Sequence, residues 1–432
     1  MRKNKIDIIS LGCSKNLVDS EHLIKQLEVA GYTVEHNPSK VNGEIVVVNT
    51  CGFIQDAQEE SVNMILELGQ AKRQGKIRKL FVMGCLSERF MADRIKELPE
   101  VDKFYGKFSW TSLLNDLGKA YDQSLCTERT LTTPSHYAYL KISEGCNRFC
   151  AFCAIPLITG RHKSLPMDQV LQEVRNLVAK GVKEFNVIAQ DLSYYGVDIE
   201  GKMLLPELID QMAQIPGVEW IRLHYAYPTQ FPYELLPVMA RHENVCKYLD
   251  IALQHINNNV LSNMRRHITA KETIELIKRI RKEVPGIHIR TTLMVGFPGE
   301  TDEAFEELKQ FVKSMRFERM GAFAYSEETG TYAEQHYADD IPQEIKSERL
   351  DTLMRIQEQI ATEINESKIG SVMKVVIDRE EELHYVGRTE FDSPEVDPEV
   401  RIEKTTTLKL GEFYDVRITD AMPFELIGEV VQ

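Results

Sequence analysis

The sequence has few cysteines, no long apolar run and a deficit of positive charge, and each shortage excludes a class of protein. Eight cysteines in 432 residues are too few for the disulfide-dense scaffold that small secreted domains need. No apolar run approaches the roughly 18 residues of a membrane-spanning helix, so no membrane partner is expected. The net charge of −14 argues against a protein that depends on bulk attraction to nucleic acid.

The N-terminus is also a poor signal peptide. Residues 1–5 are basic, but Asp7 and Ser10 interrupt the apolar residues that follow. We therefore expect a cytoplasmic protein, in a reducing compartment that keeps thiols free to bind metal. The length of 432 residues predicts two to four globular domains.

Three of the cysteines are closely spaced, in the segment Cys146-Asn-Arg-Phe-Cys150-Ala-Phe-Cys153. A 4Fe-4S cluster is usually held by four thiolates, so three on one loop leave one iron open. That iron could chelate the amino and carboxylate groups of S-adenosylmethionine (SAM). An electron from the cluster would then release a 5′-deoxyadenosyl radical, which is chemistry that only a cofactor supplies. The spacing predicts a radical SAM site with Cys146, Cys150 and Cys153 as its catalytic ligands.

Two other interpretations of this loop are weaker. A structural zinc site usually has four ligands, and the nearest candidate for the fourth is the lone His162. A disulfide framework is less expected still, because a chain of this length does not need covalent stapling.

Residues 5–125 alternate apolar strands with amphipathic helices, which predicts a parallel sheet covered on both faces. The expected strands are 6–11, 44–49 and 79–83, and the expected helices are 15–30, 56–72 and 87–98. The pattern predicts a small flavodoxin-like domain.

A second group of cysteines follows these three strands. Cys13, Cys51 and Cys85 each come after one strand, and parallel strands end at one edge of the sheet, where ligands bind. Each cysteine alone could be a small buried apolar residue. Their shared position instead predicts a second 4Fe-4S cluster, again with one iron incompletely ligated.

A linker at residues 132–135 precedes about six strand–helix units, which predict an open, partial (β/α)6 barrel. The expected strands are 137–143, 184–189, 220–225, 248–253, 288–295 and 319–325, with helices that include 167–180 and 302–315. Catalytic groups in β/α barrels lie at the carboxyl ends of strands. The loop of Cys146 begins three residues after the first strand, so motif and architecture agree.

Further SAM contacts are expected from Phe152, Gln254, Gly296 and Glu300. Phe152 occupies the aromatic position before the last cysteine of the loop, and Gln254 ends the fourth strand. Gly296 and Glu300 belong to a stretch that loosely matches the radical SAM motif G-x-I-x-G-x-x-E, although Thr292 replaces its first glycine and the acid comes one residue late. The alternative is a glycine turn without a ligand. His255, Cys126 and Cys246 are expected to be structural or inert.

After a predicted helix at 342–368, five short strands predict a small all-β barrel. They are 373–377, 385–391, 400–402, 413–418 and 424–430. Residues 369–432 carry 7 Lys and Arg against 15 Asp and Glu. Phosphate contacts need cations, so this barrel suits a basic protein partner better than RNA. A solvated acidic surface without a partner is the alternative.

This order of domains resembles the radical SAM methylthiotransferase family along essentially the whole chain, and the last barrel resembles a TRAM domain. The resemblance rests on three motifs: Ser10-Leu-Gly-Cys13-Ser-Lys-Asn-Leu-Val-Asp-Ser-Glu21, the segment from Glu144 to Pro156, and Ala189-Gln-Asp-Leu-Ser-Tyr-Tyr-Gly196. It implies an N-terminal methylthiotransferase domain at 1–130, a radical SAM domain at 131–365 and a TRAM-like barrel at 366–432. The motifs and the acidic barrel are closest to the branch that modifies a ribosomal protein.

The resemblance also implies a reaction, methylthiolation of the β-carbon of an aspartate in small-subunit ribosomal protein S-twelve, free or in the ribosomal subunit. One SAM would methylate a sulfur at the auxiliary cluster of Cys13, Cys51 and Cys85, and a second would yield the radical that activates the aspartate. A sulfur source and an electron donor such as flavodoxin or ferredoxin are implied. The alternatives are a tRNA adenosine methylthiotransferase and, less expected, a non-catalytic iron–sulfur electron carrier or scaffold.

Overall fold

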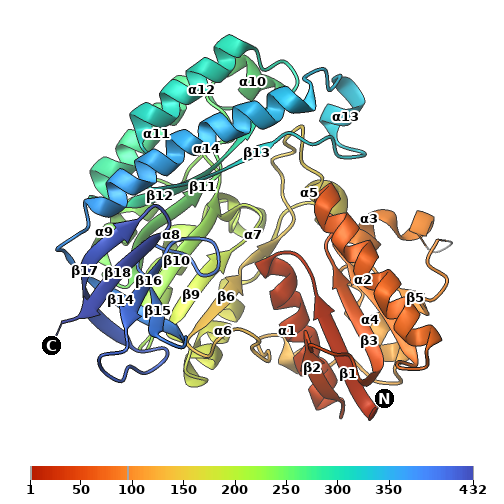
Figure 1. The fold of residues 1–432 in the computed structure, drawn as a ribbon. Coiled ribbons are helices and arrows are strands. Elements are labelled where there is room, and N and C mark those ends of the chain that lie inside the picture. Colours follow the sequence, from red (N-terminus) through yellow and green to blue (C-terminus); the bar gives the residue numbers. More distant parts are fainter. Residues whose placement is uncertain (1, 95–96, 432) are drawn as a thin grey trace.

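The computed structural model describes residues 2–94 and 97–431, which form three domains (Figure 1). The N-terminal domain has one parallel five-stranded sheet in the order β2-β1-β3-β4-β5, the order typical of flavodoxin. Its strands are β1 (Arg2–Ser10), β2 (Thr33–His36), β3 (Gly43–Thr50), β4 (Lys79–Gly84) and β5 (Lys103–Phe104), and its helices are α1 (Ser14–Val29), α2 (Gln55–Arg73), α3 (Cys85–Arg94) and α4 (Trp110–Asp116). The flavodoxin-like prediction is confirmed.

The sequence predicted three of these five strands. β2 alternates between exposed and half-buried residues, and β5 has only two residues, so neither contains an apolar run. The helix predicted to end at Leu98 was also too long. α3 ends at Arg94, and Leu98 lies outside any helix, because Pro99 disfavours helical backbone in the residue before it. Residues 95–96 of that prediction lie outside the described residues.

Both faces of this sheet are buried, which explains why its central strands are apolar without interruption. Ile8 and Val47 pack on the face covered by α1. Val46, Val48 and Val82 pack on the opposite face with α2. The domain is therefore a three-layer sandwich whose polar groups collect at the strand ends.

The middle domain is an open barrel of six parallel strands in the order β13-β12-β11-β10-β9-β6. Its strands are β6 (Tyr137–Lys141), β9 (Glu184–Ile188), β10 (Trp220–Ala226), β11 (Val245–Ile251), β12 (His288–Val295) and β13 (Arg319–Ala324). The main helices are α6 (Met167–Ala179), α8 (Leu205–Ala213), α9 (Leu235–Arg241), α11 (Ala270–Glu283), α12 (Asp302–Met315) and α14 (Gln343–Glu366). Strands β6 and β13 are the two edges, so the predicted partial (β/α)6 barrel is confirmed.

Shorter elements surround the carboxyl ends of these strands. They are the β7 (Ser143–Glu144) and β8 (Lys163–Ser164) ribbon, α5 (Ile155–Thr159), η2 (Leu192–Tyr194), α7 (Val197–Glu200), α10 (Asn258–Asn263) and α13 (Tyr332–His336). A 3-10 turn, η1 (Gln123–Leu125), lies in the segment that joins the first two domains. Within the described residues no helix is both long and apolar enough to cross a membrane.

The C-terminal domain is a closed five-stranded barrel in the order β14-β15-β16-β18-β17. Its strands are β14 (Val372–Glu380), β15 (His384–Thr389), β16 (Glu399–Glu403), β17 (Phe413–Met422) and β18 (Glu425–Val430). All five predicted strands and the TRAM-like barrel are confirmed. The domain packs against the amino-terminal ends of the central barrel strands β10 and β11, where Trp220 meets Phe413 at a ring-centroid distance of 4.8 Å and Cys246 is fully buried.

A buried ion-pair network fastens these two domains together. The Glu184 carboxylate on β9 accepts from Arg222 at 3.1 Å and from Arg388 of the C-terminal barrel at 2.7 Å. Burial alone would raise the pKa of Glu184, but Arg388 and Arg222 hold it below its usual value. A depressed pKa stabilises the fold at neutral pH, and that contribution is lost as the pH falls through the folded pKa.

Replacing this carboxylate should destabilise the protein strongly. Glu184→Gln removes the anion of the buried Arg222 and one of the two anions of the buried Arg388, which keeps Asp378. We expect a loss of about 3 kcal/mol in the free energy of unfolding. Denaturant titration measures it, with the exposed Glu382→Gln as the matched control. Equal stability of the two variants would contradict this role for Glu184.

Candidate active site

The first group of thiols lies at the carboxyl edge of the N-terminal sheet. Cys13 precedes α1 without using its thiol as a cap, Cys51 follows β3, and Cys85 begins α3 directly after β4. The loops are in contact, since a Cβ on Gly12 would lie 2.8 Å from the Cys51 Sγ. Burial raises the pKa of the Cys85 thiol to about 12, and the neighbouring Cys13 and Cys51 add to the rise. The structure therefore brings together the three cysteines that the sequence singled out.

The second group lies on the loop between β7 and α5. Gly145 has a φ of +70°, and a Cβ there would lie 2.2 Å from the Arg161 carbonyl oxygen, so only glycine fits. The Ala151 N–H donates to the Met264 carbonyl at 2.9 Å and holds the loop on the barrel. Burial raises the pKa of Cys146 to about 12 and that of Cys153 as well, with Cys150 contributing to both. The three thiols therefore share one loop at the end of the barrel.

Two residues that the sequence did not indicate contact Cys150. Arg266 donates from Nη1 to the Cys150 Sγ at 3.3 Å, and the Tyr227 hydroxyl lies 3.6 Å from the same sulfur. The guanidinium of Arg266 is buried and lies 4.1 Å from the Tyr227 ring centroid. Such outer partners orient a ligating thiolate and tune the metal centre. Arg266 is 116 positions from Cys150, so no local pattern could have revealed it.

A cavity of about 810 Å³ adjoins both cysteine loops. Phe53 comes two residues after Cys51 and Phe152 directly precedes Cys153, and both line it. The other walls come from the start of α2, from the ends of β11, β12 and β13 with the segment after β13, and from α14. Their residues are Ile54, Gln55, Asp56, Gln254, Thr292, Met294, Phe323, Ala324, Tyr325, Ser326, Glu327, Glu328, Asp339, Gln343 and Leu350. The cavity lies at the carboxyl ends of the barrel strands, where β/α barrels bind their substrates.

Gln254 has the features of a ligand-binding residue in this cavity. Its φ is +72°, a strained conformation that is concentrated at functional sites. Two backbone hydrogen bonds hold Gln254 in this conformation. Its N–H donates to the Thr292 carbonyl at 2.9 Å, and its carbonyl accepts from the Met294 N–H at 2.7 Å. Its side-chain Oε1 is buried and has no hydrogen-bond partner among the described residues. The donors of a polar ligand such as SAM would satisfy that oxygen.

Gly296 and Glu300, the two other predicted SAM contacts, lie beside residues of α14 in the structure. Neither Gly296 nor Glu300 is among the described residues that line the cavity. Gly296 has a φ of +73°, and a Cβ there would lie 2.4 Å from the Lys346 side chain. The buried Glu300 carboxylate accepts from Arg349 at 2.7 Å and lies 3.1 Å from the His255 Nε2. Both residues therefore contact α14, and Glu300 in turn contacts His255.

All eight cysteines are free thiols. Within the described ranges, no three His, Cys, Asp or Glu side chains are arranged to hold a single metal ion. His162, the one candidate for a zinc ligand beside the cysteine loop, is buried with its Nε2 3.1 Å from the Ser164 hydroxyl. The two thiol groups instead suit a cluster, in which each thiolate binds a different iron.

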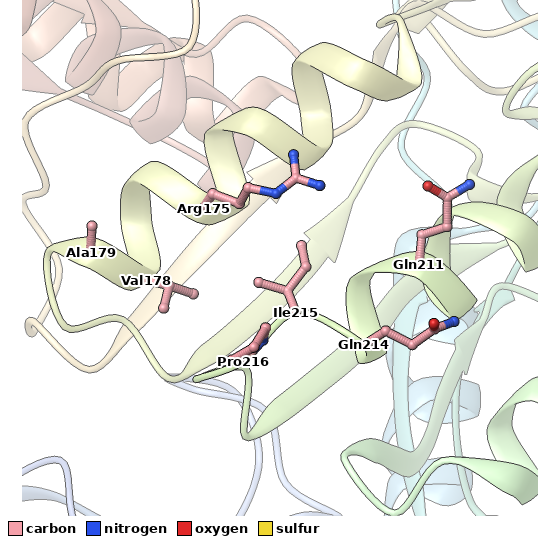
Figure 2. Close-up of a pocket in the computed structure, with 7 residues that line it drawn as sticks. All are labelled: Arg175, Val178, Ala179, Gln211, Gln214, Ile215 and Pro216. Carbon is pink, nitrogen blue, oxygen red and sulfur yellow. The ribbon is translucent and has the colours of Figure 1, made fainter.

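A second hollow of about 510 Å³ lies outside the barrel, between α6 and α8 (Figure 2). Of the seven residues that Figure 2 labels, only Arg175 is charged. None of these residues is a cysteine, so the hollow belongs to neither thiol group.

The comparisons with known proteins agree with this architecture. Residues 140–312 match the radical SAM superfamily, 369–431 the TRAM domain, and 5–106 the uncharacterized protein family UPF0004. Among solved structures, the radical S-adenosylmethionine methyltransferase TsrM from Kitasatospora setae has a TM-score of 0.55, with 14% identity over 75% of each chain. The cobalamin-dependent radical enzyme OxsB has a TM-score of 0.53, with 12% identity over 82% of this chain and 56% of its own. These two likenesses concern the fold alone.

The open barrel, its three-cysteine loop and the family matches define a radical SAM enzyme with two additional domains. Three full-length relatives are named "Ribosomal protein uS12 methylthiotransferase RimO": 66% identical in Parabacteroides distasonis, 64% in Bacteroides fragilis and 61% in Porphyromonas gingivalis, each with 100% of both chains covered. The chain therefore belongs to the RimO family of methylthiotransferases. The family resemblance inferred from the sequence motifs is confirmed.

Proposed function

We propose that this enzyme adds a methylthio group to the β-carbon of an aspartate in ribosomal protein uS12, the small-subunit protein S-twelve. The observation that carries the proposal is a cavity that adjoins both cysteine loops. Sulfur transfer to an unactivated carbon requires the sulfur donor and the radical source to reach the same carbon atom. The relatives that are 61–66% identical over the whole chain support the same reaction.

The two thiol groups would hold one 4Fe-4S cluster each. Cys146, Cys150 and Cys153 are the ligands for the cluster that binds SAM, and Cys13, Cys51 and Cys85 are the ligands for the auxiliary cluster. Bound together, the clusters and SAM supply a carbon-centred radical and a methylated sulfur. Both sets of ligands fit a 4Fe-4S cluster. All six residues are free thiols in two groups of three, and three thiolates leave one iron of each cluster open.

The protein side chains would bind and orient the cofactor. Phe152 and Gln254 form the SAM-facing wall, and the unpaired Gln254 Oε1 accepts from the ligand. Arg266 and Tyr227 hold Cys150 in place. The buried guanidinium of Arg266 also places positive charge beside a cluster that several thiolates make negative.

The mouth of the cavity suits a basic protein segment. Asp56 and Glu327 line it and are exposed, with no ion-pair partner in the part of the chain that the structure describes. The large apolar side chains Phe53, Ile54 and Phe323 are exposed beside them. Acids would repel RNA phosphates but attract the Lys and Arg side chains of a basic protein segment. We therefore favour uS12 over tRNA adenosine, the second candidate substrate.

The remaining assignments also stay proposals. The enzyme would work in the cytoplasm, draw electrons from a donor such as flavodoxin or ferredoxin, and need a sulfur source. Neither membrane nor nucleic acid is expected to dominate its binding.

Reconstituted enzyme, SAM and a reductant tested against uS12 and tRNA in parallel would decide the substrate. Peptide mass spectrometry should find a methylthio group on an aspartate of uS12 and none on tRNA. A methylthio-adenosine in tRNA with unmodified uS12 would contradict the proposal. If tRNA does bind, its affinity should fall steeply with salt concentration.

Removal of the Gln254 side chain should weaken SAM binding. We expect Gln254→Ala to raise the KM for SAM by about 10-fold, the effect of losing one buried hydrogen bond to a ligand. Initial rates of 5′-deoxyadenosine formation measure the KM. The matched control is Gln214→Ala in the hollow of Figure 2, which should leave the KM unchanged. An unchanged KM in Gln254→Ala would exclude this contact.

A further inference from the structure

The short segment 328–333, which follows β13, contacts both cysteine loops. One of its ends meets the N-terminal domain near Cys51 and Cys85, and the other meets the radical SAM loop. We call it the spacer segment. Its last two residues begin α13 (Tyr332–His336), which Figure 1 shows beyond the end of β13.

Glu328 makes the contacts at the first end. Its carboxylate is buried and accepts from the Gln55 backbone N–H at 3.0 Å and from the Gln58 side chain at 3.2 Å. It also accepts from Arg89 Nη1 at 3.2 Å, and both side chains of this ion pair are nearly inaccessible to solvent. Gln55 is the first residue of α2, directly after the loop of Cys51, and Arg89 lies on α3, which begins at Cys85.

Arg89 extends the same network to the backbone on both sides. It donates to the Gly52 carbonyl at 2.9 Å and to the Thr329 carbonyl at 2.5 Å. Gly52 follows Cys51 directly, so one guanidinium links the backbone beside Cys51 to the spacer segment.

The other end of the spacer segment is fixed to the radical SAM loop. The Ala333 N–H donates to the Ala151 carbonyl at 2.8 Å, and Ala151 lies between Cys150 and Cys153. The segment is stiff in between, because Thr331 donates its hydroxyl to the Glu328 carbonyl at 2.7 Å and accepts from the Glu334 N–H. Hydrogen bonds thus join this six-residue segment to α2 and α3 beside Cys51 and Cys85, and to the loop that carries Cys150 and Cys153.

We propose that the spacer segment sets the distance between the two thiol groups, with Glu328 as the positioning residue. This inference rests on the proposed function, in which a sulfur at one group must reach a radical generated at the other. A displacement of about 1 Å can reduce a rate about 100-fold when reacting atoms must be aligned. Loss of Glu328 should therefore lower the yield of sulfur transfer relative to SAM cleavage.

Other contacts keep the two domains together when Glu328 is lost. Asp19 on α1 pairs with Lys107 at 2.9 Å and with Lys141 of the barrel. Arg129 joins Glu21 at 2.9 Å and Glu173 of α6 at 3.0 Å. These buried pairs are independent of the spacer segment, so the expected change is local.

The test uses the reconstituted full chain with Glu328→Gln, which preserves side-chain size and removes the charge. We expect methylthiolated product per 5′-deoxyadenosine formed to fall about 10- to 100-fold. Glu328→Asp keeps the charge on a side chain that is shorter by one methylene. Its product per 5′-deoxyadenosine should lie between that of Glu328→Gln and that of the wild type. The matched control is Glu184→Gln, which disrupts a buried ion pair far from the two thiol groups. It should lower the free energy of unfolding without changing the amount of product per 5′-deoxyadenosine.

Amide hydrogen exchange of the apoprotein gives a readout independent of activity. In Glu328→Gln, exchange should accelerate in residues 51–58 and 328–333 and stay unchanged in the C-terminal barrel. An unchanged product ratio, or a ratio that falls equally in Glu184→Gln, would overturn the positioning role. Wild-type enzyme that leaves uS12 unmodified would instead contradict the proposed function itself.

Discussion

Cys150→Ala should reduce the formation of 5′-deoxyadenosine from SAM by more than about 10³-fold, because no side chain replaces the chemistry of a cluster. Cys150 is the central thiol of its group and accepts a hydrogen bond from Arg266 at 3.3 Å. Without it, two thiolates remain for the SAM-binding cluster, and the Arg266 guanidinium loses its anionic partner. Chromatography of reactions with SAM and reductant measures the loss.

Iron content separates this effect from general misfolding. The variant should keep about half of the wild-type iron, bound at the auxiliary site. Cys246→Ala is the matched control, since this thiol is buried between the barrel and the C-terminal domain and lies outside both groups. Wild-type rates of SAM cleavage in Cys150→Ala would refute the assignment of the radical site.

Cys51→Ala should have the opposite selectivity, since it should abolish methylthio transfer and spare SAM cleavage. SAM cleavage continues, since the three thiols of the barrel loop are untouched, while methylthio transfer to uS12 falls below detection. The physical reason is that Cys51 is one of three ligands at the edge of the N-terminal sheet, where the sulfur to be transferred would be held. The Ser61 hydroxyl donates to the Cys51 carbonyl at 2.9 Å and fixes its backbone, so the substitution alters little beyond the thiol.

Measurement of 5′-deoxyadenosine and methylthiolated uS12 in the same reaction tests whether Cys51→Ala loses only the methylthio transfer. Cys126→Ala is its control, because Cys126 belongs to neither group of thiols and should leave both products unchanged. Full methylthio transfer by Cys51→Ala would show that the second cluster has been assigned to the wrong residues.

Much of this fold is encoded in local sequence patterns. The buried strands β3 and β4 are continuous apolar runs, and the parallel arrangement that they imply brings Cys13, Cys51 and Cys85 to one edge. The spacing of Cys146, Cys150 and Cys153 indicates its chemistry without any structure. β2 and β5 were missed because short strands at the margins of a sheet have little apolar signal.

The rest of the site depends on long-range contacts. Arg266 reaches Cys150, and Glu328 reaches Arg89 across 239 positions, so neither contact follows from local sequence. The loose motif match at Gly296 and Glu300 predicts SAM contacts, and in the structure these two residues contact Lys346 and Arg349 of α14. A strand-end glycine or acid serves packing as readily as a ligand.

The central claim is that two thiol groups serve one reaction on one protein. Peptide mass spectrometry of uS12 from cells with and without the gene tests it most directly. We predict a methylthio group on a single aspartate that is present only with the gene and absent when the gene carries either Cys51→Ala or Cys150→Ala. Unmodified uS12 in cells with the intact gene, together with a gene-dependent methylthio-adenosine in tRNA, would contradict the account.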